Sequence, residues 1–259
     1  MKIGFIGMGN MALALAKGFA DSGKVEAKDM YAYAPNQEKL KKNAEVTGFN
    51  AMSDIVEMVR EVQIVIMACK PYQIDEVLAK VGDELKEKAL VSVAAGWVHE
   101  SFASKLGLTR IQCIMPNTPA MVGEGVMLFE ETNSLNKEEL DYVKDIFSSL
   151  GIVEVLPTRL MGIGGAVSGC GPAFMDLMME AYADAAVKYG IQRAMAYRLA
   201  AQTMLGSAKL ALESGQNPAA LKDAVCSPAG TTIRGVAALE EWGFRNACIK
   251  SIDAIMEKK

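Results

Sequence analysis

The chain has 259 residues, which exceeds one typical domain and suits two modest ones. Hydrophobic residues make up 51% and charged residues 22%, so we expect a sizeable core and exclude an intrinsically disordered chain. The net charge is −4 and lysine and arginine do not cluster, which argues against nucleic acid and anionic membrane surfaces as partners.

The sequence carries no obvious targeting or metal-binding pattern. No stretch approaches the roughly 18 uninterrupted apolar residues of a membrane span, and the start, MKIGFIGMGN, lacks the features of a secretory signal. A single histidine, His99, cannot build a zinc site, and we expect it to lie in solvent or to cap a helix. The odd number of cysteines without a CxxC pair favours free thiols in a cytoplasmic protein, at Cys69, Cys113, Cys170, Cys226 and Cys248.

The first part of the chain alternates short apolar runs with segments of helical periodicity. Continuous apolar runs are typical of strands that are covered on both faces of a parallel sheet. Strands are expected at Lys2–Ile6, Met30–Ala34, Ile64–Ala68, Leu90–Ala94 and Ile111–Met115. Helices are expected at Asn10–Ser22, Gln37–Glu45, Ser53–Glu61 and Asn136–Leu150, the last capped by Asn136. This alternation predicts an α/β fold with a Rossmann-like, doubly wound parallel sheet.

Strand-like patterns stop near Val155–Thr158, which predicts a first domain of residues 1–156 and an all-helical second domain of residues 157–259. The second domain should contain helices at Pro172–Tyr189 and Gln192–Ser214, and two more within Ile233–Lys258. The second of these helices is apolar or small on most faces, which is typical of a buried helix. Burial against a second copy of the chain is favoured, and burial against the first domain is the alternative.

A glycine-rich turn follows the first predicted strand. Gly7, Gly9 and Ala12 form a G-x-G-x-x-A pattern between strand and helix, typical of dinucleotide-binding domains. Gly7 permits the tight turn, Gly9 leaves room for the pyrophosphate, and the helix N-terminus supplies N–H donors to it. The alternative is a tight turn without a ligand.

The choice of dinucleotide depends on the end of the second strand. An NAD site usually has an acidic residue there, but the strand ends at Ala34-Pro35-Asn36, and Asp29 lies at the opposite end. No arginine is present to hold a 2′-phosphate. The missing carboxylate favours NADPH, with NADH as a possible second cofactor.

Further turns follow other predicted elements. The turns ACKP, AAG and PNTP lie at carboxyl ends of strands, the edge where open α/β sheets bind ligands. Lys70 in the first of them is either catalytic or, as we favour, a residue that fixes the turn. The segments Ser168–Ala173 and Ser227–Thr232 precede long helices, and each either binds an anion such as a carboxylate or only caps its helix. Cys170 and Cys226 in these segments are either reactive thiols or, as we favour, small buried residues.

Taken together, GMGNMA, ACKP, VAAG, MPNTP, SGCGPAF and LKDAVCSPAGTTIRG resemble, in this order, the motifs of pyrroline-5-carboxylate reductases. The resemblance implies a Rossmann domain and an all-helical domain that binds substrate and dimerises, with assembly of dimers into larger rings. It implies reduction of the cyclic imino acid 1-pyrroline-5-carboxylate to proline with NAD(P)H. The cofactor would contact Ile6, Gly7, Met8, Gly9, Asn10, Met11, Ala34, Asn36, Ala68, Cys69, Lys70, Pro71, Val93, Ala94 and Ala95.

The resemblance also implies that the backbone of Gly230, Thr231 and Thr232 binds the substrate carboxylate and that the Thr232 hydroxyl faces the ring nitrogen, as the candidate catalytic group. A protonated imine is already a good electrophile, so no strong acid is required. The sequence departs from the family pattern in four places. Ala229 replaces a glycine, Cys170 a serine, Phe174 a tyrosine and Ala34 a hydroxyl-bearing residue.

Two other functions fit parts of the pattern. A β-hydroxyacid or deazaflavin-linked reductase would share the architecture, but the former would need a lysine early in the helix that begins near Pro172, where Met178 and Met179 lie. A protein that binds a dinucleotide without catalysis would use the SPAGTT segment only to cap a helix.

Overall fold

The computed structural model describes residues 1–107 and 110–257, which form two compact units. The first unit is Met1–Gly169 and the second begins at Cys170. The boundary expected at residues 156 and 157 lies before η4 (Thr158–Leu160) and α7 (Met161–Ser168). The compact units divide later in the chain because α7 packs on the sheet of the first unit.

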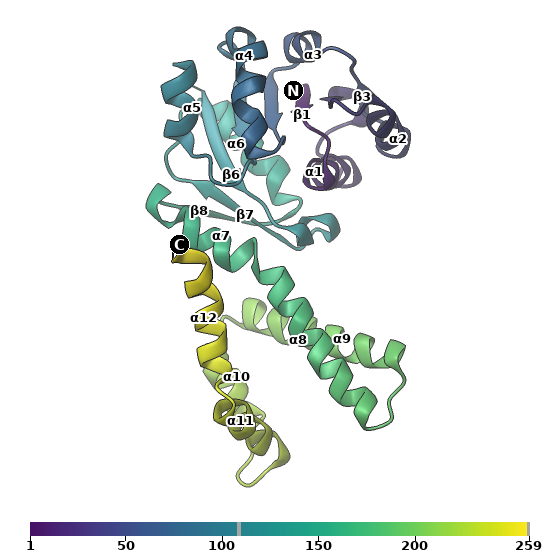
Figure 1. The fold of residues 1–259 in the computed structure, drawn as a ribbon, viewed down its shortest axis with the longest axis vertical. Coiled ribbons are helices and arrows are strands. Elements are labelled where there is room, and N and C mark those ends of the chain that lie inside the picture. Colours follow the sequence, from purple (N-terminus) through teal and green to yellow (C-terminus); the bar gives the residue numbers. More distant parts are fainter. Residues whose placement is uncertain (108–109, 258–259) are drawn as a thin grey trace. The chain divides into compact units, whose positions relative to one another are not determined.

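An eight-stranded sheet forms the centre of the first unit (Figure 1). Its spatial order is β3-β2-β1-β4-β5-β6-β7-β8, and all neighbouring strands are parallel except β6 and β7. The strands are β1 (Ile3–Ile6), β2 (Met30–Tyr33), β3 (Asn50–Ala51), β4 (Ile64–Met67), β5 (Ala89–Ser92), β6 (Ile111–Met115), β7 (Gly125–Glu130) and β8 (Gly151–Leu156).

The five predicted strands are confirmed within one or two residues at their ends. The expectation of a wholly parallel sheet is wrong at one position, because β7 pairs antiparallel with β6. Strands β3, β7 and β8 were not predicted. Strand β3 has only two residues, and the apolar residues of β8 are interrupted by Glu154, so neither strand gives a continuous apolar run.

Helices cover both faces of the sheet and connect its parallel strands. They are α1 (Asn10–Asp21), α2 (Gln37–Thr47), α3 (Ile55–Glu61), α4 (Ile74–Leu85), α5 (His99–Leu106) and α6 (Lys137–Ser148), with 3₁₀ turns η1 (Ala27–Asp29), η2 (Pro71–Gln73) and η3 (Thr118–Val122). The predicted cap Asn136 is confirmed, because its side chain accepts a hydrogen bond from the amide of Glu139. Helix α4 was not predicted, although its buried residues recur at helical spacing.

The core of the first unit has two layers because side chains of a strand alternate between the faces of a sheet. Phe5 of β1 packs with α1, α2 and α6, whereas Ile6, the next residue, packs with α3, α4 and α5. Val65 and Ile66 of β4 alternate in the same way. The two-sided burial explains the continuous apolar runs and confirms the predicted doubly wound architecture.

All the regular secondary structure described in the second unit is helical. Its helices are α8 (Gly171–Lys188), α9 (Arg193–Ser214), α10 (Pro218–Ala224), α11 (Thr231–Glu241) and α12 (Phe244–Met256). They confirm the two long predicted helices and the two predicted within Ile233–Lys258, although Lys258 itself lies outside the described residues. Helix α10 was not predicted. Helices α8 and α9 pack against each other.

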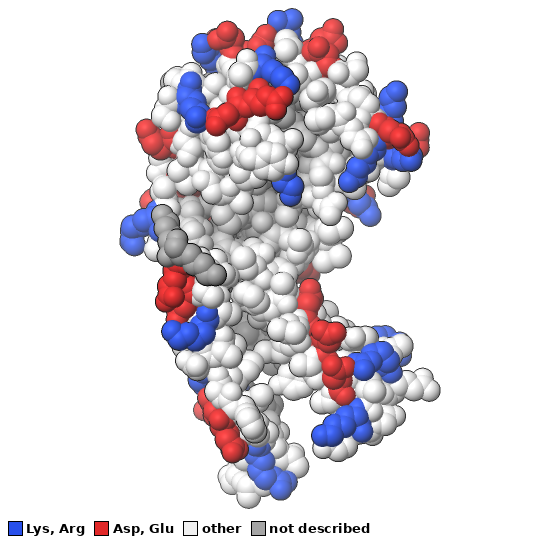
Figure 2. All heavy atoms as spheres, in the orientation of Figure 1, with Lys and Arg blue, Asp and Glu red and all other residues white. Residues whose placement is uncertain are grey.

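Helix α9 leaves most of its apolar side chains exposed in the single chain. Its one buried residue is Ala196, while Leu199, Leu205, Leu210 and Leu212 are exposed. On the face drawn in Figure 2, large parts of the second unit carry no charged side chain. Among the described residues, none of the helices combines the length and apolar character needed to cross a bilayer.

Candidate functional site

The turn between β1 and α1 is shaped by two glycines with different surroundings. Gly7 has a φ of +94°, and a Cβ there would lie 2.8 Å from the amide nitrogen of Cys69. Its own amide donates to the carbonyl of Tyr33 at 2.8 Å, so the turn fits tightly between β2 and the end of β4. Gly9, in contrast, faces open space within 4 Å. It precedes α1, whose first N–H groups are not capped by a described side chain.

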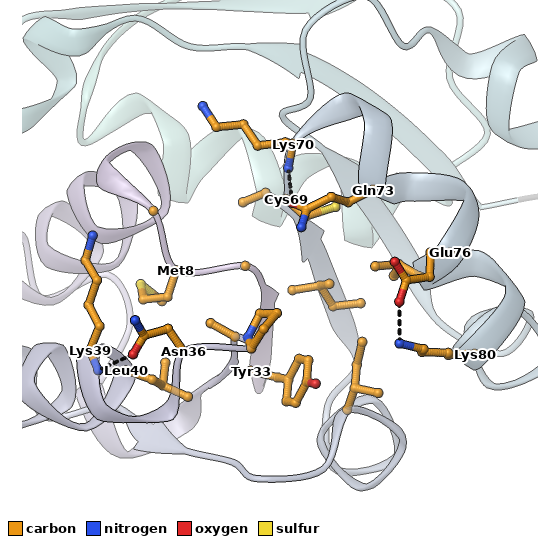
Figure 3. A pocket seen from close by; sticks show the side chains of 18 residues that line it. Met8, Tyr33, Asn36, Lys39, Leu40, Cys69, Lys70, Gln73, Glu76 and Lys80 are labelled. Carbon is orange, nitrogen blue, oxygen red and sulfur yellow. Dashed lines mark hydrogen bonds and ion pairs between the residues drawn. The ribbon is translucent and has the colours of Figure 1, made fainter.

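A pocket of about 320 Å³ opens beside this turn (Figure 3). It lies where the strand order reverses, since β2 and β4 flank β1 on opposite sides. Such a reversal is the usual ligand site of an open α/β sheet. The turn and the carboxyl ends of three neighbouring strands thus form one site.

The pocket brings together nine of the fifteen predicted cofactor residues. They are Ile6, Gly7, Met8, Gly9, Ala34, Asn36, Ala68, Cys69 and Lys70. The remaining six do not line it, and they are Asn10, Met11, Pro71, Val93, Ala94 and Ala95.

Sequence reasoning missed several residues that line the same pocket. They are Tyr33, Lys39, Leu40, Ile55, Gln73, Glu76, Val77 and Lys80, while Pro35 lies inside the predicted turn Ala34-Pro35-Asn36. Lys39 and Leu40 lie in the first turn of α2, so the strand–turn–helix pattern after β2 could have identified them. Glu76 and Lys80 belong to α4, which was not predicted, and they form an ion pair at 2.7 Å across one helical turn.

Lys39 supplies a cation where the sequence had shown no arginine. The side chain of Asn36 caps α2 by accepting a hydrogen bond from the amide of Lys39 at 2.9 Å. The Lys39 side chain is exposed at the pocket edge, and no described acidic residue forms an ion pair with it. Lys70 lies at another edge of the pocket, at the end of β4 (Figure 3).

Cys69 also lines the pocket, half-buried at the end of β4. Its sulfur contacts the sulfur of Met67 at 3.6 Å. Burial raises the pKa of the Cys69 thiol to about 11, because a thiolate would lose solvation there. Cys69 is therefore a neutral side chain at physiological pH.

The second predicted site, Ser227–Thr232, is a tight turn before α11. The amide of Gly230 donates to the carbonyl of Ser227 at 3.0 Å, so this amide is already occupied. A Cβ on Gly230 would collide with the Ser227 hydroxyl. Helix α11 begins at Thr231, and no described side chain caps it. The amides of Thr231 and Thr232 are therefore the free donors of this turn.

The side chain of Thr232 lines a separate, mostly apolar hollow of the second unit. The hollow has a volume of about 500 Å³, and its other lining residues are Tyr182, Gly235, Val236, Ala238, Leu239 and Trp242. Thr232 thus brings a hydroxyl group, besides that of Tyr182, to a predominantly apolar setting.

Comparison with known proteins identifies the family. Residues 158–259 match the family model described as pyrroline-5-carboxylate reductase dimerisation, and residues 2–96 match that described as NADP oxidoreductase, coenzyme F420-dependent. The chain is 40% identical to the pyrroline-5-carboxylate reductase of Treponema pallidum over 261 residues, which covers 99% of both chains. The chain belongs to the pyrroline-5-carboxylate reductase family.

Other pyrroline-5-carboxylate reductases agree in sequence and in fold. The Escherichia coli reductase is 41% identical over 259 residues, covering 99% of this chain and 96% of that one. The crystal structure of the Plasmodium falciparum reductase with NADP bound has a TM-score of 0.89 and 34% identity, covering 98% and 95% of the two chains. The full-length similarity confirms the predicted resemblance and decides against the two rival reductase classes.

One departure from the pyrroline-5-carboxylate reductase pattern has a clear structural consequence. Ala229 has a φ of +57°, the one positive value among the non-glycine residues that the structure describes. Alanine is strained in this left-handed region, where glycine is not. The position therefore has the backbone conformation that favours the glycine of the family pattern. Cys170 at the start of α8 is exposed and contributes no cap.

His99 and Lys70 both form hydrogen bonds within the first unit. His99 is the first residue of α5, its amide donates to the Glu130 carboxylate at 2.7 Å, and its ring Nε2 lies 2.8 Å from the Ser134 hydroxyl. The Lys70 amide donates to the Gln73 side chain at 3.1 Å and so helps to form the turn before η2. These contacts favour structural roles for both residues.

Proposed function

We propose that this chain reduces 1-pyrroline-5-carboxylate to L-proline with NADPH, the last step of proline biosynthesis. The observation that carries the proposal is full-length similarity to pyrroline-5-carboxylate reductases, joined to a pocket at the strand reversal that begins with G-x-G-x-x-A. The uncapped start of α11 adds a site of the kind that binds carboxylates.

The chemistry is the addition of a hydride and a proton across one carbon–nitrogen double bond. When bound, NADPH would supply the hydride for the imine carbon and leave as NADP⁺, and the proton would end on the ring nitrogen. The amides of Thr231 and Thr232 donate hydrogen bonds to the substrate carboxylate, and the Thr232 hydroxyl hydrogen-bonds the ring nitrogen. Gly230 contributes mainly by lacking a Cβ, because its amide already donates to Ser227.

The preference for NADPH rests on the start of α2. The end of β2 carries no carboxylate, so a 2′-phosphate meets no repulsion there. Lys39 lies at the pocket edge without an ion-pair partner among the described residues, and it supplies the positive charge that would attract this phosphate. NADH lacks the phosphate and should be a weaker substrate.

A second copy of the chain is expected to cover the helical unit. The match to the dimerisation family model supports a homo-oligomer, and the exposed leucines of α9 are suited to an apolar interface. A ring of dimers and a cytoplasmic location remain predictions. Size-exclusion chromatography with light scattering distinguishes a dimer from a larger ring.

The decisive experiment follows oxidation of NADPH and of NADH with 1-pyrroline-5-carboxylate and with its six-membered homologue. Proline must form in proportion to the NADPH consumed. If proline or the imine binds but no NADPH is oxidised, the chain is a dinucleotide-binding protein without this activity. Oxidation with the six-membered imine alone would assign a different substrate.

A further inference from the structure

The turn after β6 contains a buried asparagine that neither the cofactor pocket nor the carboxylate site uses. Asn117 of the MPNTP segment is 6% exposed and bonded at both ends of its side-chain amide. Its Oδ1 accepts a hydrogen bond from the amide of Val126 at 2.8 Å, and its Nδ2 donates to the carbonyl of Ser168 at 3.0 Å. One side chain therefore joins the end of β6, the start of β7 and the last turn of α7.

The hydrogen bond to the carbonyl of Ser168 lies at the end of a helix. Ser168 is the last residue of α7, and the last carbonyls of a helix receive no hydrogen bond from within the helix. The SGCGPA segment starts at this residue, and α8 follows at Gly171. Asn117 thus holds the chain at the point where it leaves the first unit.

Helix α7 is already held closely along its length. A Cβ on Gly165 would collide with the Met115 sulfur, and one on Gly164 would lie 2.9 Å from Leu128. These glycines bring the helix near the sheet, but they do not fix its last carbonyl. Asn117 supplies the polar contact that does so.

We propose that Asn117 is a positioning residue for catalysis, which acts through the Ser168 carbonyl to fix the start of the SGCGPA segment and of α8. This inference rests on the proposed function, because that segment is one of the two candidate anion-binding segments of the chain. Asn117 need not touch the substrate. Its loss should therefore weaken use of 1-pyrroline-5-carboxylate while NADPH binding stays intact.

Asn117→Asp tests this positioning role because it replaces the donor Nδ2 with an oxygen atom. An ionised carboxylate still accepts from Val126, but it places an oxygen against the Ser168 carbonyl. A protonated carboxyl restores the donor, so activity should recover as the pH falls. Glu124 precedes β7 and Glu130 ends it, and both carboxylates are also present in the wild type. A pH dependence that the variant shows and the wild type lacks therefore reports the introduced carboxyl.

Gln112→Glu is the matched control. Gln112 is 1% exposed and its amide donates to the carbonyls of Cys113 and Glu130, at 2.8 and 3.0 Å. It is a buried amide in β6, the strand that precedes Asn117, and it has no hydrogen bond to Ser168. Its variant should lose stability without a selective effect on the imine substrate.

The measurement is kcat and KM for both substrates, with Tm, at mildly alkaline and mildly acidic pH. We expect Asn117→Asp to lower kcat/KM for 1-pyrroline-5-carboxylate about tenfold at alkaline pH, with recovery toward wild type at acidic pH and little change in KM for NADPH. Wild-type values at alkaline pH, or a rise in KM for NADPH as large as that for 1-pyrroline-5-carboxylate, would overturn the inference.

A second variant keeps the inference testable if Asn117→Asp does not fold. Asn117→Ser is too short to bridge Val126 and Ser168 together, so the same selective loss is expected, and unchanged kinetics would overturn the role. An inactive wild-type enzyme would instead contradict the proposed function. The two failures are thus distinguished by the wild-type assay.

Discussion

Gly7 lies directly against the backbone of Ala68, because a Cβ added at Gly7 would be 2.9 Å from both the carbonyl carbon and the carbonyl oxygen of Ala68. The φ of +94° at Gly7 adds a second reason for glycine. Gly9, two residues on, has no such neighbour. The two glycines of the turn therefore have separable roles, the first in folding and the second in leaving space for a ligand.

Alanine at each position separates these roles. Gly7→Ala should destabilise the protein by about 2 kcal/mol or more, because backbone atoms must move. Gly9→Ala should keep the wild-type Tm but weaken NADPH binding about tenfold, because the methyl group occupies the space left for the pyrophosphate. Thermal unfolding and a fluorescence titration with NADPH check both. Equal loss of Tm in the two variants would contradict the separation.

Lys39 should discriminate between the two nicotinamide cofactors. Lys39→Gln removes the charge near the start of α2 and should raise KM for NADPH about tenfold while leaving KM for NADH unchanged. Lys39→Arg should retain the preference. Lys42→Gln is the control, since Lys42 lies on the same helix but pairs with Glu38 at 2.9 Å. An equal rise in KM for both cofactors would remove Lys39 from phosphate recognition.

Much of this architecture follows from patterns that are local in the sequence. The runs at β1 and β4 are apolar throughout because both faces of the sheet are covered, and the glycine turn marks the first of the crossovers. Strand β8 escapes prediction because its GIVEVL sequence lies partly exposed, and its pairing with β7 is a contact between distant residues.

The sequence predicts the parts of the candidate site that depend on backbone geometry. It does not predict the side chains that other elements contribute to the pocket. Gly7 and Ala229 need positive φ values that the turn sequences suggest. Lys39 was not predicted because only arginine was considered as the residue that would hold a 2′-phosphate. The occupied amide of Gly230 depends on how the Ser227 turn closes, which the residue types alone do not specify.

Replacing the strained Ala229 should raise the stability of the protein. Ala229→Gly relieves the left-handed backbone cost, partly offset by the greater freedom of glycine in the unfolded chain, so a net gain of about 1 kcal/mol or less is expected. Differential scanning calorimetry should show a Tm higher by about 2 °C. Ala229→Val should lower Tm, because a β-branched residue tolerates a positive φ less well. A lower Tm for Ala229→Gly would show that the alanine is not strained.

Cys69 should resist alkylation at neutral pH. Its pKa is raised from 9.0 to about 11, so the thiolate fraction in the folded protein is about a hundredfold below that of the unfolded chain. Burial of the neutral thiol contributes stability that is present below pH 9.0 and is lost as the pH rises through about 11. Peptide-resolved iodoacetamide labelling, with the urea-unfolded protein as control, measures the rate.

Saturating NADPH should slow this labelling further, since Cys69 lines the pocket. A rate at neutral pH equal to that of the unfolded chain would contradict the burial of the thiol. A rate that NADPH leaves unchanged would place the cofactor elsewhere.

Thr232 offers two groups, an amide and a hydroxyl, and substitution separates them. Thr232→Val keeps the amide and the side-chain shape but lacks the hydroxyl, so the carboxylate contact should persist while the hydrogen bond to the ring nitrogen is lost. We expect kcat to fall about tenfold to a hundredfold with little change in the dissociation constant of NADPH. Thr232→Ser restores the hydroxyl and should recover most of kcat.

Thr231→Val is the control within the same turn, because it removes a neighbouring hydroxyl and keeps both amides. Steady-state kinetics with 1-pyrroline-5-carboxylate then distinguishes the two side chains. If Thr232→Val and Thr231→Val both show wild-type kcat, neither hydroxyl takes part in the reaction. The start of α11 would then act through its amides alone, and the proton that ends on nitrogen would have to come from solvent or from the protonated substrate itself.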